Sequence, residues 1–183
     1  MIDTVRGYAD ADPEEQTVES GSSIVTYWSD EEIQRVLDRH KTEYIHALMD
    51  AQPTYESGSS VFKQYLLGTG NVESGTAVFK IEDTAGTVTG WTADYTRGIV
   101  TFTADQSGKS FYWSGFAYDL DAAAADIWRM KASHVAGLVD FSTDGHSIKR
   151  SQQARAYLDM ANYYQNRSAT ESIVTAKIVR DDV

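Results

Sequence analysis

The sequence predicts an α+β protein in which a helical bundle of about three main helices carries an inserted β-rich hairpin subdomain. Two observations predict this fold class. In the outer parts of the chain, apolar residues recur every three or four positions, as on one face of a helix. Between these parts, apolar and polar residues alternate in short runs separated by turn residues, as in strands. The predicted parts are an acidic N-terminal arm (1–28), a discontinuous helical core (29–53 and 118–168), a β-rich insertion (54–117) and a C-terminal β-prone tail (169–183).

The N-terminal part is predicted to be an arm followed by a helix. Residues 1–23 are rich in acidic side chains and contain Pro, Gly and Ser, a composition typical of poorly ordered segments. The helix has a capping-box signature, with Ser29 as the N-cap and Glu32 three residues later. Pro53 is expected to end it. Its predicted apolar stripe is Ile33, Val36, Leu37, His40, Tyr44 and Leu48.

The insertion, residues 54–117, contains strand-like runs separated by turn signals that include Gly. The clearest element is a hairpin over residues 91–102 with its turn at Tyr95–Gly98. Gly98 is free to take a positive φ angle in that turn. The strand-like runs are 61–67, 76–81, 87–93, 99–103 and 111–118.

Two amphipathic helices are predicted in residues 118–168, joined by the turn-rich run 140–145. The first begins with acids that suit a helix N-terminus and continues through a run of alanines. The second begins near Ser151. A short connection favours an antiparallel pair whose apolar faces form a shared core. The two faces are Leu120, Ala124, Ile127, Met130, His134 and Leu138 on the first helix, and Ala154, Tyr157, Leu158, Ala161 and Tyr164 on the second.

The composition limits the classes of function. The chain has 183 residues, enough for one domain with a good core, and a formal net charge of −11. This charge argues against a surface that grips phosphates. An acidic surface suits the wall of a channel through which DNA passes without binding. It is also typical of adaptation to high salt, so both interpretations stay open. The absence of Cys excludes disulfides and thiolate metal sites. No run approaches the roughly 20 apolar residues of a membrane span, and no signal peptide is recognised.

Each motif that suggests chemistry has a simpler interpretation. Residues 108–110 (G-K-S) match the end of a phosphate-binding loop, but the upstream Gly that the loop requires is Thr103. Residues 140–145 match only the first half of a calcium loop and are expected to form a turn. His40 and His134 are expected to be hydrogen-bonded core residues, because no further zinc ligands accompany them. The sequence therefore predicts no catalytic, cofactor or metal site.

Four segments carry motifs of a known family. They are W-S-D-E-E-I (Trp28–Ile33), the hairpin W-T-A-D-Y-T-R-G-I-V-T-F (Trp91–Phe102), Y-D-L-D-A-A-A-A-D (Tyr118–Asp126) and D-F-S-T-D-G-H-S-I-K-R-S-Q (Asp140–Gln152). In this order they resemble motifs of the head–tail connector (adaptor) proteins of tailed viruses, the portal-docking neck ring family. The last two are the most specific. In the hairpin, the first and third residues replace commoner ones.

The resemblance implies a structural virion protein at the neck, the junction of head and tail, made in the host cytoplasm. It implies a helical bundle with a β insertion, in a homo-oligomeric ring of about twelve copies, a dodecamer. One face of the ring would dock on the portal protein, and the other would meet a head-closure (stopper) or tail-tube protein. DNA would pass the channel without sequence-specific binding. No enzyme activity, cofactor or membrane is implied.

Two segments are expected to contact these partners. The tail is apolar and β-branched and has no hairpin mate nearby, and an unpaired strand offers its backbone groups to another chain. We expect it to add a strand to the portal or to an adjacent subunit; the alternative left open is that it pairs within its own β insertion. The hairpin turn is expected to reach a neighbouring subunit or a neck partner. The predicted partner-binding residues are Ile173, Val174, Thr175, Ala176, Lys177, Ile178, Val179 and Arg180 in the tail, and Tyr95, Thr96, Arg97 and Gly98 in the turn.

Two alternative functions stay open on the sequence. One is a virion-associated protein that binds or hydrolyses glycans with the aromatic side chains of the insertion and acids such as Asp94 and Asp105. Hydrolysis would require two carboxylates at a fixed separation in one cleft. The other is a monomeric binding module.

Overall fold

The computed structural model describes residues 1–17, 24–56, 58–136, 141–143, 146–148 and 150–171. The chain divides into two compact units. Residues 1–40 and 119–183 form the helical unit, and residues 41–118 form the β unit. The chain passes between the units at 40/41 and again at 118/119.

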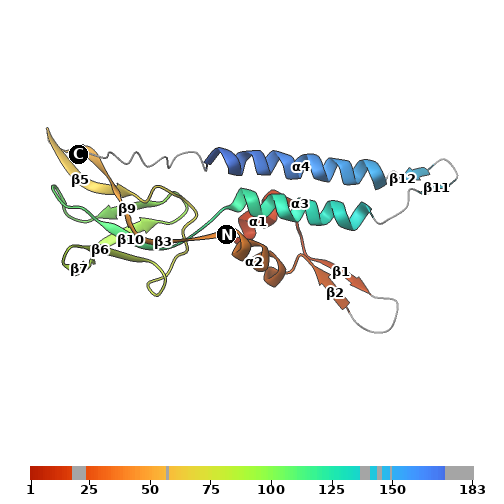
Figure 1. Ribbon diagram of the computed structural model, residues 1–183, viewed down its shortest axis with the longest axis horizontal. Coiled ribbons are helices and arrows are strands. Elements are labelled where there is room, and N and C mark those ends of the chain that lie inside the picture. Colours follow the sequence, from red (N-terminus) through yellow and green to blue (C-terminus); the bar gives the residue numbers. More distant parts are fainter. Residues whose placement is uncertain (18–23, 57, 137–140, 144–145, 149, 172–183) are drawn as a thin grey trace, which may run out of the picture. The chain divides into compact units, whose positions relative to one another are not determined.

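The helical unit contains four helices within its described residues. They are α1 (Ile2–Ala9), α2 (Asp30–Arg39), α3 (Leu120–Ala136) and α4 (Arg150–Glu171). Figure 1 shows α3 and α4 side by side and antiparallel, as the sequence predicted for this pair. Two short antiparallel hairpins complete the unit: β1 (Glu14–Thr17) with β2 (Ile24–Tyr27), and β11 (Phe141–Thr143) with β12 (His146–Ile148).

The start of helix α2 confirms the predicted capping box. The Ser29 hydroxyl accepts a hydrogen bond from the Glu32 N–H at 3.3 Å, and the Glu32 carboxylate accepts one from the Trp28 N–H at 2.7 Å. The predicted end at Pro53 is wrong, because α2 ends at Arg39 and strand β3 begins at Lys41. The next residues include Thr, Tyr and Ile, which fit a pleated sheet. Pairing with a neighbouring strand therefore overrides the helical spacing.

The acidic N-terminal arm is also a wrong prediction for its first residues, since Ile2–Ala9 form helix α1. Val5, Ala9 and Ala11 are buried. The apolar residues of this short helix have amphipathic spacing, but they lie in a segment whose overall composition is acidic. A prediction from composition alone therefore missed a helix that contributes to the core.

The small side chains of Ala123, Ala124 and Ala125 let helix α3 approach its neighbours closely, and all three are fully buried. Ala124 and Ala125 pack in a cluster with Trp128, Ala161 and Tyr164. The Asp119 carboxylate accepts the Ala122 N–H at 2.8 Å and caps the helix.

The β unit consists of two antiparallel sheets of four strands each. This finding corrects the predicted fold class: the protein is α+β, but it is much richer in strands than a bundle of three helices with a hairpin insertion. The first sheet has the order β3 (Lys41–Leu48), β10 (Tyr112–Tyr118), β6 (Lys80–Asp83), β7 (Gly86–Thr87). The second has the order β4 (Asp50–Glu56), β5 (Ser59–Leu66), β9 (Ile99–Phe102), β8 (Trp91–Asp94).

Both sheets contribute to one core. Trp113 and Ile81 from the first sheet and Tyr65 and Val100 from the second are fully or almost fully buried in the same cluster. The Tyr65 ring lies edge-on to that of Phe102, with centroids 5.4 Å apart. The β unit is therefore a two-layer sandwich with its own hydrophobic core.

The predicted hairpin is present as β8 and β9, with Gly98 in its turn at a φ angle of +67°. A Cβ atom added at Gly98 would lie 1.7 Å from the Thr69 carbonyl oxygen, and one at Gly70 would lie 2.6 Å from the Thr96 carbonyl oxygen. The turn and the loop after β5 are thus packed backbone against backbone. Only glycine fits at both positions.

Candidate functional site

Helix α4 presents apolar side chains that no described element covers. Its buried face includes Ala154, Ala161 and Tyr164. Leu158 was predicted to join this core, and that prediction is wrong, because 48% of its surface is exposed. Met160 is also exposed. At about 100° per residue, Leu158 and Met160 flank the buried face on opposite sides. The apolar surface of α4 is therefore wider than the surface that its neighbours bury.

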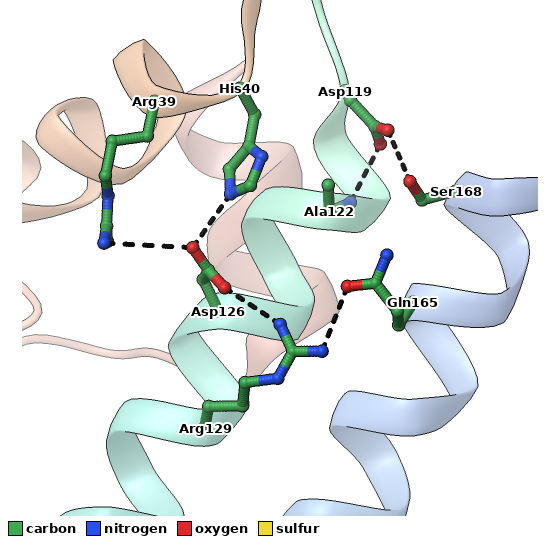
Figure 2. A network of polar contacts seen from close by, with 8 residues as sticks. All are labelled: Arg39, His40, Asp119, Ala122, Asp126, Arg129, Gln165 and Ser168. Atoms are coloured by element: carbon green, nitrogen blue, oxygen red, sulfur yellow. Dashed lines mark hydrogen bonds and ion pairs between the residues drawn. The ribbon is translucent and has the colours of Figure 1, made fainter. Parts of the chain in front are cut away.

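A polar network joins helices α2, α3 and α4 (Figure 2). The Asp126 carboxylate lies 2.9 Å from His40 Nε2, 3.9 Å from Arg39 Nη1 and 3.0 Å from Arg129 Nη1. Arg129 also donates to the Gln165 Oε1 atom at 3.0 Å. The Asp126 carboxylate on α3 thus contacts basic side chains from the end of α2 and from α3 itself. One of these side chains, Arg129, also contacts α4.

The network lowers the pKa of Asp126. Burial alone would raise the pKa, but the hydrogen bonds with His40 and Arg129 and the positive charge of Arg39 outweigh burial. Because the folded-state pKa lies below the unfolded value, this carboxylate stabilises the fold fully above about pH 4. The contribution is lost as the pH falls through the lower folded-state pKa.

A second polar group connects the start of α3 with the end of α4. Ser168 donates to the Asp119 carboxylate at 2.6 Å, as Figure 2 shows. Asp121 is 6% exposed, and its Oδ1 atom has no hydrogen-bond partner. Arg167 Nη2 lies 3.4 Å from that atom, close enough for an ion pair but not aligned for a hydrogen bond. The Arg167 guanidinium also lies 5.6–5.8 Å from the ring centroids of Tyr8, Tyr163 and Tyr164.

Burial raises the pKa of Asp121, and the nearby Asp119 raises it further, while Arg167 partly opposes both effects. Because the pKa of Asp121 is raised, its contribution to stability depends on pH in the opposite sense to that of Asp126. The charged Asp121 costs stability above its folded-state pKa, and the cost disappears as the pH falls below the unfolded value of about 4.

Ser168 bonds to the Asp119 carboxylate, and His40 bonds to the Asp126 carboxylate. His134 was predicted in the core, but it is exposed and its ring lies 5.3 Å from that of Tyr27. The network fixes helices relative to one another.

The predicted turn site, Tyr95–Gly98, is only partly available to a partner. Thr96 and Arg97 are exposed, whereas Gly98 is buried. The Tyr95 ring lies edge-on to the Phe79 ring, with centroids 5.3 Å apart. A partner at this turn would therefore meet Thr96 and Arg97. The other predicted site residues, Ile173–Arg180, lie outside the described residues.

The carboxylates considered for glycan hydrolysis are not paired. Asp94 accepts the Arg97 N–H at 3.1 Å, and Asp105 accepts the Phe62 and Ser107 N–H groups at 2.8 and 3.2 Å. Asp94 precedes β9 and Asp105 follows it, so the two acids stabilise turns at opposite ends of that strand. This placement does not provide the two carboxylates of one cleft.

The remaining sequence signals give no metal or membrane site in the described part of the chain. Gly108 lies in a turn, and the element directly after it is strand β10, not the helix of a phosphate-binding loop. Asp140, Asp144 and Gly145 of the calcium-like run lie outside the described residues. The ranges that the structure describes hold no group of three or more metal-ligating side chains. None of the helices described is long and apolar enough to cross a membrane.

The structure also exposes a surface that the sequence prediction missed. Ile45 and Leu48, on strand β3, are 75% and 58% exposed. They were assigned to a helix, in which Leu48 belonged to a buried stripe. Burial along residues 41–48 does not alternate, and a bulge interrupts the pairing of this strand, so simple alternation could not have located the exposed face.

Comparisons of the chain with protein-family models, with curated proteins and with solved structures gave no match in any of the three. The function is therefore inferred from the motifs of the sequence and from the surfaces described above.

Proposed function

We propose that this chain is a head–tail connector (adaptor) protein of tailed viruses. In this proposal, copies of the chain form a ring between the portal and the head-closure or tail proteins, and the ring extends the DNA channel. The proposal rests on the motifs that the chain shares with this family and on one structural observation. That observation is the apolar surface of α4 left uncovered beside its buried face.

The exposed side chains Leu158, Met160 and Tyr163 support self-assembly. They are 48%, 37% and 53% exposed, on a helix whose Ala154, Ala161 and Tyr164 pack into the core. Exposed apolar groups that gather on one element are typical of surfaces that bind protein. In a ring, the two flanks of α4 would contact neighbouring copies. The net charge of −11 suits a channel protein that does not retain DNA.

The test is the mass of the assembly in solution, measured by mass photometry with and without purified portal protein. The proposal expects a ring-sized complex when portal is present. Leu158→Glu should weaken ring formation at least about tenfold, because it places a charge in an apolar contact. Gln152→Glu is the matched control, since it adds the same charge to an exposed position of α4 and removes no apolar group.

Two results would contradict the proposal. One is a chain that stays monomeric at every concentration in the presence of portal. The other is an equal effect of the two substitutions, which would show that the uncovered flank of α4 makes no contact in the assembly.

A further inference from the structure

The outer face of the first sheet carries an apolar patch at its β3 edge. Leu48, Tyr112 and Glu82 stand opposite one another across three neighbouring strands, so their side chains share one face. The intervening residues Ala47, Trp113 and Ile81 point into the sandwich, where Trp113 and Ile81 are fully buried. The row with Leu48 is therefore on the outside.

A bulge places more side chains on this face. Ala47 pairs with Trp113 and Tyr44 with Gly115, so Ile45 and His46 together oppose the single residue Ser114. His46 has a φ angle of +52°, which is uncommon for a residue with a side chain. Its ring stacks on Tyr112 with centroids 4.1 Å apart, and its N–H donates to the Ser114 hydroxyl at 3.0 Å. Bulges of this kind redirect side chains at sheet edges.

We call Ile45, His46, Leu48, Tyr112 and Glu82 the β3 patch. Acidic side chains surround its apolar centre: Glu82 lies 3.6 Å from His46 Nδ1, and Glu43 and Asp50 are exposed on either side along the chain. The registers place two basic residues on this face: Lys80 opposite Ser114, and Lys41 opposite Tyr118 at the far end of β3. Lys41 is paired with Glu73 at 3.0 Å. A complementary partner would be apolar and carry basic residues.

The C-terminal tail of this chain has that chemistry. Residues 173–180 read I-V-T-A-K-I-V-R, which combines β-branched residues with Lys177 and Arg180. A regular strand at the edge of β3 would be interrupted by the bulge, so side-chain contacts on the patch are the favoured mode of binding. Residues 172–183 follow helix α4, whose exposed flank supports assembly.

We propose that the tail of one copy docks on the β3 patch of a second copy, with Lys177 and Arg180 near the acidic rim. This inference rests on the proposed ring function and names the acceptor of the tail. Each copy offers one tail and one patch. Head-to-tail contacts between such unlike surfaces close into rings when the rotation between copies permits it.

The natural absence of Cys allows a direct test by disulfide formation in the full-length chain, without portal protein. One sample mixes a Leu48→Cys chain with an Ile178→Cys chain that carries a tag of different mass. The control replaces Leu48→Cys by Tyr55→Cys, at a position that is 81% exposed on β4. Mild oxidation and mass analysis without reductant give the rate of mixed dimer formation.

The proposal expects the Leu48→Cys pair to form at least about tenfold faster than the Tyr55→Cys control, because docking raises the effective concentration of the tail. Adding Lys177→Glu to the tail should slow the Leu48→Cys pair, and the difference should shrink in high salt. Equal rates for the two pairs would overturn the proposal.

A chain with both Leu48→Cys and Ile178→Cys separates docking between copies from docking within one. If it closes an internal disulfide at high dilution faster than the mixed dimer forms, the tail binds its own patch and the contact between copies is wrong. Because no portal is added, a negative result here leaves the portal test of the proposed function to be decided separately.

Discussion

Two residues that looked equivalent in the sequence, Ile127 and Leu158, should respond very differently to truncation. Both lie in the middle of predicted apolar faces. Ile127 is 0% exposed, whereas Leu158 is 48% exposed. The substitutions Ile127→Ala and Leu158→Ala each remove three carbon atoms from a helix, and Ala is the better helix former in both cases, so any loss of stability comes from packing.

The expected losses follow from burial. Each buried methylene contributes about 0.8 kcal/mol, so Ile127→Ala loses about 2.4 kcal/mol of transfer free energy. The cavity that remains in a packed interior adds to this, for a total of about 3–4 kcal/mol. For Leu158 about half of the transfer term applies, and solvent fills the space, so the expected loss is about 1 kcal/mol or less.

The assay is urea unfolding of the dilute monomer, followed by far-ultraviolet circular dichroism at the helical wavelength. The chain has four Trp, of which Trp28 and Trp128 lie in the helical unit, so fluorescence reports the β unit alone only where these two are replaced by Phe in the parent and in both variants. The fully buried Trp113 then follows the β unit while circular dichroism follows the helices. Equal losses for the two variants, or a loss below about 1 kcal/mol for Ile127→Ala, would refute the burial argument. At concentrations where rings form, Leu158→Ala should also reduce assembly.

Three further substitutions test the polar and backbone features. Asp121→Asn should stabilise the protein at neutral pH, and the gain should vanish below about pH 4, where the raised pKa of Asp121 no longer matters; a pH-independent effect would contradict this. Asp126→Asn should destabilise the protein at neutral pH and should reduce the fall in melting temperature as the pH is lowered, measured by thermal melts from pH 2 to 7. If the melting temperature of the variant falls in acid as steeply as that of the parent, the lowered pKa of Asp126 has no role in stability. Gly98→Val should disturb the β unit severely. The sequence alone predicts that Gly98→Asn is milder, but the structure predicts a severe effect for it as well, because any Cβ at this position would lie 1.7 Å from the Thr69 carbonyl oxygen. A melting temperature of Gly98→Asn within a few degrees of the parent would contradict this contact.

The elements that local signals define were predictable. The capping box at Ser29, the antiparallel helix pair and the turn at Gly98 each depend on residues close together in the chain. The strand-like runs 61–67, 99–103 and 111–118 correspond to β5, β9 and β10. The run 76–81 is mostly a turn before β6, and only the last three residues of 87–93 belong to β8. Periodicity and turn chemistry are local properties, so the sequence contains enough information to locate such elements.

Elements that depend on distant partners were not predictable in this way. Residues 41–48 show helical spacing, but strand β10, some seventy positions later, pairs with them and converts them to an edge strand. Leu158 fits an apolar helical face, and only the position of α3 reveals that it is uncovered. The basic partners of Asp126 likewise include Arg39 and His40, more than eighty positions earlier in the chain, so no local motif could have brought them together.

The two points where the chain crosses between its units have a consequence for how such a protein can change. On the helical side, the Asp119 N–H donates to the His40 carbonyl oxygen at 3.0 Å, and on the other side Lys41 and Tyr118 are paired neighbours in adjacent strands. A segment whose two ends are already in contact can be gained, lost or exchanged without stretching its host. The sandwich is thus an interchangeable module, and the four helices are a frame on which evolution or an engineer could mount a different one.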